Sequence, residues 1–199
     1  MLPRAVLFDM DGVLVRSEEV WLQVLEAAGT RFRGRPVSRD EFAPTFGQGT
    51  QADLAVFGLD CTAAELDAFY ELEFARRLDQ LWVNPQARPL LQALADRGVA
   101  RAVVTNTAGP LANRILERAE LASLLPVRAT SDLVAHPKPA PDLVVLALGA
   151  LGLAPDQAWM VGDSPFDRAA ARAAGVRFLG LGLDGDLRLA SLGDFPLPR

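Results

Sequence analysis

The 199-residue sequence has only one lysine, one histidine and one cysteine. With a single cysteine, Cys61, no disulfide can form within the chain, and we expect a small buried or half-exposed thiol there. Arginine and lysine number 20 against 25 acidic residues, which gives a formal net charge of −5. No basic run exceeds a few residues, so a nucleic-acid partner is not expected.

Long apolar runs are also missing. No window of about 18 uncharged apolar residues occurs, which argues against a transmembrane helix. The opening residues MLPRAVLFDMDG place Arg4 within the apolar run and acids directly after it, unlike a secretory signal peptide. We therefore expect a cytoplasmic protein without a membrane partner, either a monomer or a homodimer. Because half of the residues are hydrophobic, a sizeable core is expected.

Short apolar runs alternate with helical patterns along most of the chain. Strands are predicted at 5–8, 100–104, 126–130, 158–162 and 176–182, and helices at 89–98, 109–121, 140–152 and 167–175. This alternation is typical of an α/β fold built on a doubly wound parallel sheet. Such sheets place their functional sites at the carboxyl ends of the strands.

Residues 16–84, called the helical insert here, interrupt the alternation. Ser17 is predicted to cap a helix that has Glu18 and Glu19 in its first turn. The TAAE sequence at 62–65 predicts a capping box before a second amphipathic helix. No strand is predicted in this region. We expect a catalytic core of residues 1–15 and 85–199, joined to the insert through connectors at 13–16 and 81–85.

Two carboxylates follow the first predicted strand. In an extended segment Asp9 and Asp11 point to the same side, where they repel each other unless a cation lies between them. A divalent ion such as Mg²⁺, which prefers oxygen ligands, satisfies that requirement. A pair of acids that caps a loop explains the same pattern equally well.

Other strand ends carry groups that suit phosphate and metal chemistry. Asp163 and Asp167 lie four residues apart after the strand at 158–162. Thr105 ends another strand, and the only lysine, Lys138, follows a third. Each residue has a local alternative, namely helix capping for the acids and Thr105, and a solvated surface charge for Lys138. Four strand ends with matching groups favour one shared site.

Four segments together resemble a known superfamily. The sequences DMDGVLV, VVTNT, KPAPD and GDSPFDRAAARAAG, in this order, resemble the four motifs of the haloacid dehalogenase superfamily. The resemblance covers the whole chain, and the helical insert resembles that superfamily's first-type helical cap. Within the superfamily the sequence is similar to phosphoglycolate phosphatases and β-phosphoglucomutase-like proteins.

The resemblance implies a role for each motif residue. Asp9 would be the nucleophile, and Asp11 would act as the general acid and base. Lys138, with Thr105 and the backbone amide of Asn106, would hold the phosphoryl group. The set of ligands implied for Mg²⁺ is Asp9, the main-chain carbonyl of Asp11, and Asp163, with Asp167 bound through water or fixing Lys138.

The same residues narrow the range of reactions expected within the superfamily. Dehalogenases of this fold do not need an acid at the position of Asp11, so its presence favours phosphoryl chemistry. Phosphonoacetaldehyde hydrolases need a cap lysine, which the insert lacks, and related mutases carry histidine where this chain has Trp21. We expect a Mg²⁺-dependent phosphatase acting on a small phosphorylated metabolite, of the phosphoglycolate or sugar phosphate type. The alternatives are a β-phosphoglucomutase-like phosphotransferase, a phosphoryl-regulated module and a catalytically dead binding protein.

Substrate-contacting residues are expected in the insert. The segment FGQGTQ at 46–51 resembles the family's specificity segment, and Gln48, Thr50 and Gln51 would reach the hydroxyls of a sugar or hydroxy acid. Arg16, at the mouth of the first connector, would either touch an anionic substrate or face solvent. The arginines of RFRGR at 31–35 are expected in a solvated loop, and His136 is expected to have no chemical role.

Overall fold

A computed structural model describes residues 3–197. Its main sheet has six parallel strands in the order β5-β4-β1-β6-β7-β8. The strands are β1 (Ala5–Phe8), β4 (Ala100–Thr105), β5 (Val127–Thr130), β6 (Ala158–Gly162), β7 (Arg177–Leu181) and β8 (Leu187–Leu189). The predicted α/β fold with a parallel sheet is confirmed. Sequence reasoning missed β8 because three residues are too few to show a periodic pattern.

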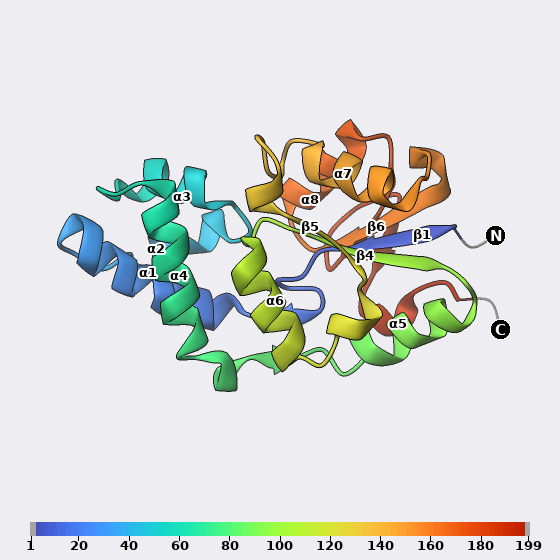
Figure 1. Cartoon of the computed structure of the whole chain (residues 1–199), viewed down its shortest axis with the longest axis horizontal. Coiled ribbons are helices and arrows are strands. Elements are labelled where there is room, and N and C mark those ends of the chain that lie inside the picture. Colours follow the sequence, from blue (N-terminus) through green and yellow to red (C-terminus); the bar gives the residue numbers. More distant parts are fainter. Residues whose placement is uncertain (1–2, 198–199) are drawn as a thin grey trace.

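Helices cover both faces of this sheet (Figure 1). The helices α5 (Ala87–Asp96) and α6 (Gly109–Arg118) lie on one face, and α7 (Asp142–Leu151) and α8 (Pro165–Ala173) lie on the other. Side chains of β1 alternate between the two resulting cores, with Phe8 in one and Leu7 in the other. Every residue of β1 is fully buried, so this strand forms the centre of the molecule.

The pairing of β1 determines where the strand ends meet. Phe8, the last residue of β1, lies opposite Val103 of β4 and Val161 of β6. Side chains just beyond these strands therefore gather at one edge of the sheet. Asp9 and Asp163 directly follow β1 and β6, and Thr105 is the last residue of β4.

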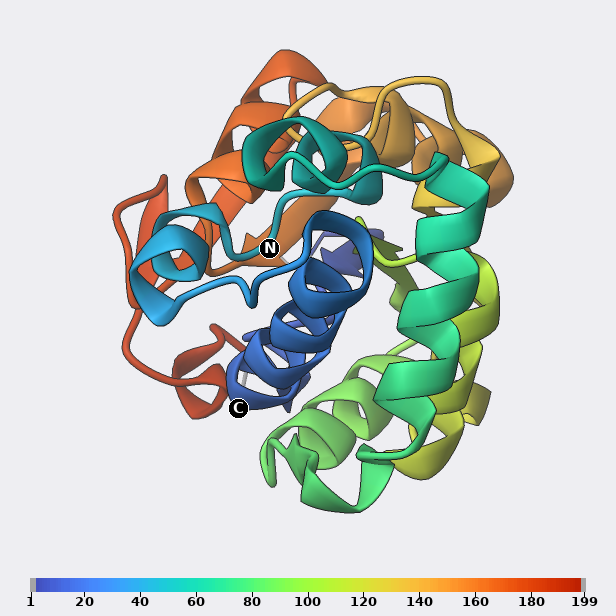
Figure 2. The same ribbon diagram turned by 90° about the vertical axis from the view of Figure 1, so that its left-hand side faces the viewer.

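The helical insert stands over this edge (Figures 1 and 2). It contains α1 (Glu18–Arg33), α2 (Arg39–Phe42), α3 (Thr50–Phe57) and α4 (Ala63–Ala75), and α1 packs against α4. The predicted capping box at the start of α4 is confirmed, because Thr62 and Glu65 each accept a hydrogen bond from the other's backbone N–H. Single 3-10 turns lie at 43–45, 78–80, 122–124, 131–133, 155–157 and 192–194.

The two connectors of the insert run side by side. The expectation of no strand within residues 16–84 was wrong, because β2 (Val15–Arg16) pairs antiparallel with β3 (Trp82–Val83). Two-residue strands leave no alternation in a sequence. The side chain of Asn84 adds a hydrogen bond to the carbonyl oxygen of Val13. A membrane-crossing segment would need a longer or more apolar helix than any within residues 3–197.

Candidate active site

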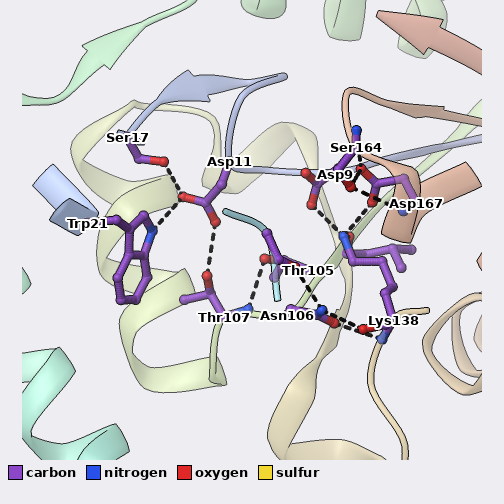
Figure 3. A network of polar contacts seen from close by, with 12 residues as sticks. Asp9, Asp11, Ser17, Trp21, Thr105, Asn106, Thr107, Lys138, Ser164 and Asp167 are labelled. Atoms are coloured by element: carbon purple, nitrogen blue, oxygen red, sulfur yellow. Dashed lines mark hydrogen bonds and ion pairs between the residues drawn. The ribbon is translucent and has the colours of Figure 1, made fainter. Parts of the chain in front are cut away.

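The ammonium group of Lys138 lies at the centre of a buried polar network (Figure 3). Its Nζ atom donates to Oδ1 of Asp9 and to Oδ1 of Asp167, each at 2.7 Å, and to the carbonyl oxygen of Val104 at 3.1 Å. Burial alone would lower the pKa of Lys138, but the two carboxylates outweigh burial and raise it above its usual value. The only lysine of the chain is therefore a charged internal residue and not a surface charge.

The two carboxylates bound to Lys138 have different surroundings. Asp167 is fully buried, and its second oxygen accepts hydrogen bonds from the backbone and the hydroxyl of Ser164. The second oxygen of Asp9 receives no hydrogen bond from the described residues, and Asp9 lines a pocket between the core and the helical insert. Burial, and then the charge of Asp167, raise the pKa of Asp9 well above its usual value. Asp167 is thus a fixed counter-charge, whereas Asp9 keeps a free oxygen at the pocket.

Three carboxylates come close enough to share a cation. Oxygens of Asp9, Asp163 and Asp167 lie within 4.8 Å of one another. The charge of Asp11 also acts on Asp9, so the four carboxylates and the one ammonium carry a net charge of −3 when all are ionised. Burial and the charge of Asp167 raise the pKa of Asp163 to about 7. An all-oxygen donor set with excess negative charge fits a hard divalent cation.

Gly12 leaves the space that Asp163 fills. A Cβ atom at Gly12 would lie 1.8 Å from Oδ2 of Asp163, and the φ angle of Gly12 is +85°. Only glycine satisfies both conditions at low cost, because other residues are strained at positive φ. The turn after β1 is therefore shaped around the Asp163 carboxylate. The side chain of Asp11 does not belong to this acidic cluster, and the implied ligation by its main-chain carbonyl stays a prediction.

Three donors hold the Asp11 carboxylate instead (Figure 3). Oδ1 accepts hydrogen bonds from the Ser17 hydroxyl and from the Trp21 indole at 3.1 Å, and Oδ2 accepts one from the Thr107 hydroxyl at 2.9 Å. Ser17 occupies the N-cap position of α1, as predicted, but its side chain makes no capping hydrogen bond. The hydroxyl of Ser17 binds Asp11 because the turn after β1 brings this carboxylate to the start of α1.

Asn106 fixes the loop that carries Lys138. Its side-chain oxygen accepts from the backbone N–H of Lys138, and its amide nitrogen donates to the carbonyl oxygens of Lys138 and Gly47. The Thr105 hydroxyl oxygen accepts from the backbone N–H of Thr107 at 3.1 Å, which leaves the Thr105 O–H proton for another acceptor. Asn106 therefore connects the Lys138 loop to the insert through Gly47, a role that the prediction for its backbone amide did not include.

A pocket of about 630 Å³, counted with its opening to solvent, lies between the core and the insert. Asp9, Asp11, Thr105, Asn106 and Lys138 line its core side. The structure therefore gathers these five predicted site residues around one space.

Two of the four expected substrate residues lie at this pocket and two do not. Gln48 and Thr50 line it, whereas Gln51 is exposed and outside it. The guanidinium of Arg16 lies 4.5 Å from the centre of the Trp82 ring, and Arg16 lines a separate groove beside Asp163. Arg16 is exposed, which agrees with the solvent-facing alternative, whereas the placement of Gln51 in the substrate pocket is corrected. On a helix, Gln51 points away from its neighbour Thr50, which residue type alone does not reveal.

The other polar residues noted in the sequence have local roles. The expectation of a solvated loop at 31–35 is corrected, because Arg31 and Arg33 belong to α1 and the Arg33 side chain is nearly buried. Arg33 and Arg35 both bind the carboxylate of Glu41 within the insert. His136 is exposed, and its Nδ1 lies 3.2 Å from Oδ2 of Asp142.

Sequence reasoning missed a buried acidic residue in the insert. Asp53 of α3 lines the pocket and is only 6% exposed. It accepts hydrogen bonds from the Gln48 amide at 2.7 Å and from the Tyr70 hydroxyl at 2.9 Å. Burial raises the pKa of Asp53 to about 7. Nothing in the surrounding sequence distinguishes it from a surface acid, since the contacts come from another helix and a loop.

Comparison with known proteins agrees with this geometry. A family model described as haloacid dehalogenase-like hydrolase matches residues 3–175. A phosphoglycolate phosphatase from Rhodospirillum rubrum is 36% identical over 192 residues, which cover 88% of this chain and 78% of the relative. One from Xanthomonas campestris is 34% identical over 181 residues, 87% of this chain and 80% of the relative.

A solved structure shares the fold. The crystal structure of CbbY from Rhodobacter sphaeroides in complex with phosphate matches with a TM-score of 0.86 at 23% identity, covering 98% of this chain and 97% of that one. The family match spans most of the chain, and the two phosphatase relatives cover more than four fifths of it. The chain therefore belongs to the haloacid dehalogenase-like hydrolase family and is an enzyme of the phosphatase type.

Proposed function

We propose that this enzyme is a Mg²⁺-dependent phosphatase that hydrolyses a small phosphorylated metabolite through an aspartyl-phosphate on Asp9. The proposal rests on the different surroundings of the two Asp9 carboxylate oxygens. Lys138 binds Oδ1, whereas Oδ2 receives no hydrogen bond from residues 3–197. Asp9 itself lines the pocket. Phosphoglycolate and sugar phosphates are the two ester classes to be distinguished.

The first step forms the covalent intermediate. Oδ2 of Asp9 attacks phosphorus, and the bond from phosphorus to the ester oxygen breaks. Asp11, in its protonated form, gives its proton to the departing alkoxide. The hydrogen bonds from Ser17, Trp21 and Thr107 hold the Asp11 carboxylate at the pocket. The Thr105 hydroxyl and the Lys138 ammonium stabilise charge on the phosphoryl oxygens.

The second step releases phosphate. The Asp11 carboxylate now takes a proton from water, whose oxygen attacks phosphorus. The bond between phosphorus and Asp9 breaks, which returns Asp9 to its carboxylate form. Lys138 stays on Oδ1 of Asp9 in both steps, so the nucleophile keeps its orientation.

Asp9 and Asp163 would hold the metal. Both oxygens of Asp167 have partners from Lys138 and Ser164, so Asp167 fixes Lys138 and leaves direct ligation to the other two carboxylates. When bound, Mg²⁺ offsets negative charge where the phosphate and the carboxylates meet.

We also propose that residues 16–84 act as a cap that completes the pocket. Gln48 and Thr50 of this segment line the pocket, and Trp21 of α1 binds Asp11. An ion pair between Glu71 of α4 and Arg114 of α6, at 3.0 Å, joins the insert to the core across the same interface. Closing the insert would exclude water from the reacting phosphate.

Replacing Asp9 tests its assignment as the nucleophile. We expect Asp9→Asn to lower turnover of p-nitrophenyl phosphate by about 10³-fold or more, because an amide does not form the acyl phosphate. The melting temperature should stay the same or rise, since one of four crowded carboxylates is removed and Lys138 keeps Asp167. The exposed Asp156→Asn is the matched control. Substantial turnover by folded Asp9→Asn would eliminate the assignment of Asp9.

Metal binding should show in stability as well as in activity. The pKa of Asp163 is about 7, raised from 3.8, so without metal the folded state binds more protons than the unfolded state between about pH 4 and 7. Stability of the metal-free protein should therefore fall as the pH rises through this window. Mg²⁺ should raise the melting temperature more at pH 7.5 than at pH 5, and EDTA should reverse the effect.

The variant Asp163→Asn provides the control for this measurement. It should lose most of the Mg²⁺ effect on the melting temperature and most of the fall in stability with pH. A Mg²⁺ effect of equal size at both pH values, or one retained in Asp163→Asn, would count against Asp163 as a ligand.

A pair of glycine variants separates backbone strain from loss of the site. Gly12 and Gly34 both have positive φ, but only Gly12 faces Asp163, whereas a Cβ at Gly34 meets nothing within 4 Å. Both Gly→Ala variants should lose about 1–2 kcal/mol of stability from the left-handed backbone. Only Gly12→Ala should also lose turnover and the Mg²⁺-induced rise in melting temperature. If Gly12→Ala kept both properties, turnover and Mg²⁺ binding would not depend on the observed position of the Asp163 carboxylate.

A further inference from the structure

The insert side of the pocket contains carboxylates and no cationic side chain. Asp53 of α3 and Asp67 of α4 both line it. Within residues 3–197 the only arginine or lysine at the pocket is Lys138, which is buried at the core end against Asp9 and Asp167. A negatively charged group that extends from the phosphate toward the insert would therefore meet no positive side chain.

The side-chain donors of this wall are already engaged. Gln48 and Tyr70 donate to Asp53, and Thr50 donates to Asp67 at 2.5 Å. Among the other donors of the wall, the Trp21 indole is bound to Asp11, and the Thr45 hydroxyl donates to the carbonyl oxygen of Phe42. Of these five side chains only the second N–H of the Gln48 amide is left without an acceptor.

Acceptor atoms, in contrast, are available. Oδ2 of Asp67 accepts no hydrogen bond from the described residues, and neither does Oε1 of Gln48. The Gln48 amide donates its nitrogen to Asp53, as an ionised carboxylate requires, so its oxygen is the free atom. The wall thus offers oxygen acceptors to whatever the phosphate carries.

On the insert side of the pocket, the start of α3 is a feature that favours an anion. A helix N-terminus carries about half a positive unit charge, and Gly49 supplies no side-chain cap there. Asp53 lies in the first turn of the same helix and already complements that partial charge. Asp67 adds a second carboxylate, which accepts from Thr50 at the first position of α3. Above the Asp53 pKa of about 7, two carboxylates outweigh about half a unit charge, so the wall then favours donors over anions.

We propose that the natural leaving group is an alcohol that carries hydrogen-bond donors, hydroxyl or amino, and no negative charge. The inference rests on the proposed phosphatase function and specifies its substrate class. A donor group on the substrate would bind Oδ2 of Asp67 and Oε1 of Gln48. The carboxylate of phosphoglycolate would instead be desolvated against Asp67 without a cation to pair with. A hydroxyl-bearing ester such as a sugar phosphate is thereby favoured over phosphoglycolate, although both relatives described above bear the name phosphoglycolate phosphatase.

Three two-carbon phosphate esters of nearly equal size test the proposal. They are phosphoglycolate, 2-hydroxyethyl phosphate and O-phosphoethanolamine, which end in a carboxylate, a hydroxyl and an ammonium group. With Mg²⁺ present, kcat/KM for the hydroxyl and ammonium esters should exceed that for phosphoglycolate by about tenfold or more. Equal rates, or a preference for phosphoglycolate, would overturn the proposal.

Variants of Asp67 locate the source of the preference. Asp67→Asn, at a half-buried position on α4, should shrink the ratio between the ammonium ester and phosphoglycolate by about tenfold. Asp40→Asn makes the same chemical change at an exposed position of α2 and should leave the ratio unchanged. An unchanged ratio in folded Asp67→Asn would also contradict the proposal, because the discriminating charge would lie elsewhere.

A binding measurement separates this inference from the proposed function. Calorimetric titration of the three esters into Asp9→Asn with Mg²⁺ should give the same order of affinity without any turnover. If the wild-type enzyme hydrolysed neither these esters nor p-nitrophenyl phosphate, the proposed function would fail while the binding order still decided the inference. Tightest binding of phosphoglycolate would overturn the inference on its own.

Discussion

The bridge from the Lys138 ammonium to the carboxylates of Asp9 and Asp167 is the interaction on which the site depends. All three side chains are at least nine-tenths buried, and removing the ammonium would leave two carboxylates without their cation. A compact ammonium can donate to two carboxylates and a carbonyl oxygen in this narrow space, whereas a planar guanidinium is wider and suits paired, fork-like contacts. The presence of a single lysine among many arginines thus has a physical explanation at this position.

The helical insert contributes to this centre directly. Trp21 and Ser17, at the start of α1, bind the Asp11 carboxylate, and the Asn106 amide reaches the Gly47 carbonyl oxygen. The proposed acid and base therefore depends on the position of α1. Moving the insert would open the pocket and would also change the hydrogen bonds from Ser17 and Trp21 to Asp11. Closure of the pocket is therefore coupled to the positioning of the proposed acid and base.

Sequence reasoning located the centre of the site because its geometry follows from topology. Parallel strands bring their carboxyl ends together, so Asp9, Thr105 and Asp163 could be placed at one edge from three short motifs. Contacts that depend on tertiary packing could not be predicted from the sequence. Ser17 follows the local preference for a helix cap yet binds Asp11, and Asp53 looks like a surface acid until α4 and the loop at Gln48 bury it. Strands of two or three residues, such as β2 and β8, carry no period to detect.

The most direct test identifies the carboxylate that receives the phosphoryl group. The variant Asp11→Asn should still react with p-nitrophenyl phosphate, whose leaving group needs no proton, but should hydrolyse the intermediate slowly. Acid quenching, digestion and mass spectrometry would then locate the added phosphoryl group. We expect it on Asp9, in the peptide that contains the end of β1. A phosphoryl group on Asp163 or Asp167, or none on the protein during turnover, would contradict the proposed mechanism.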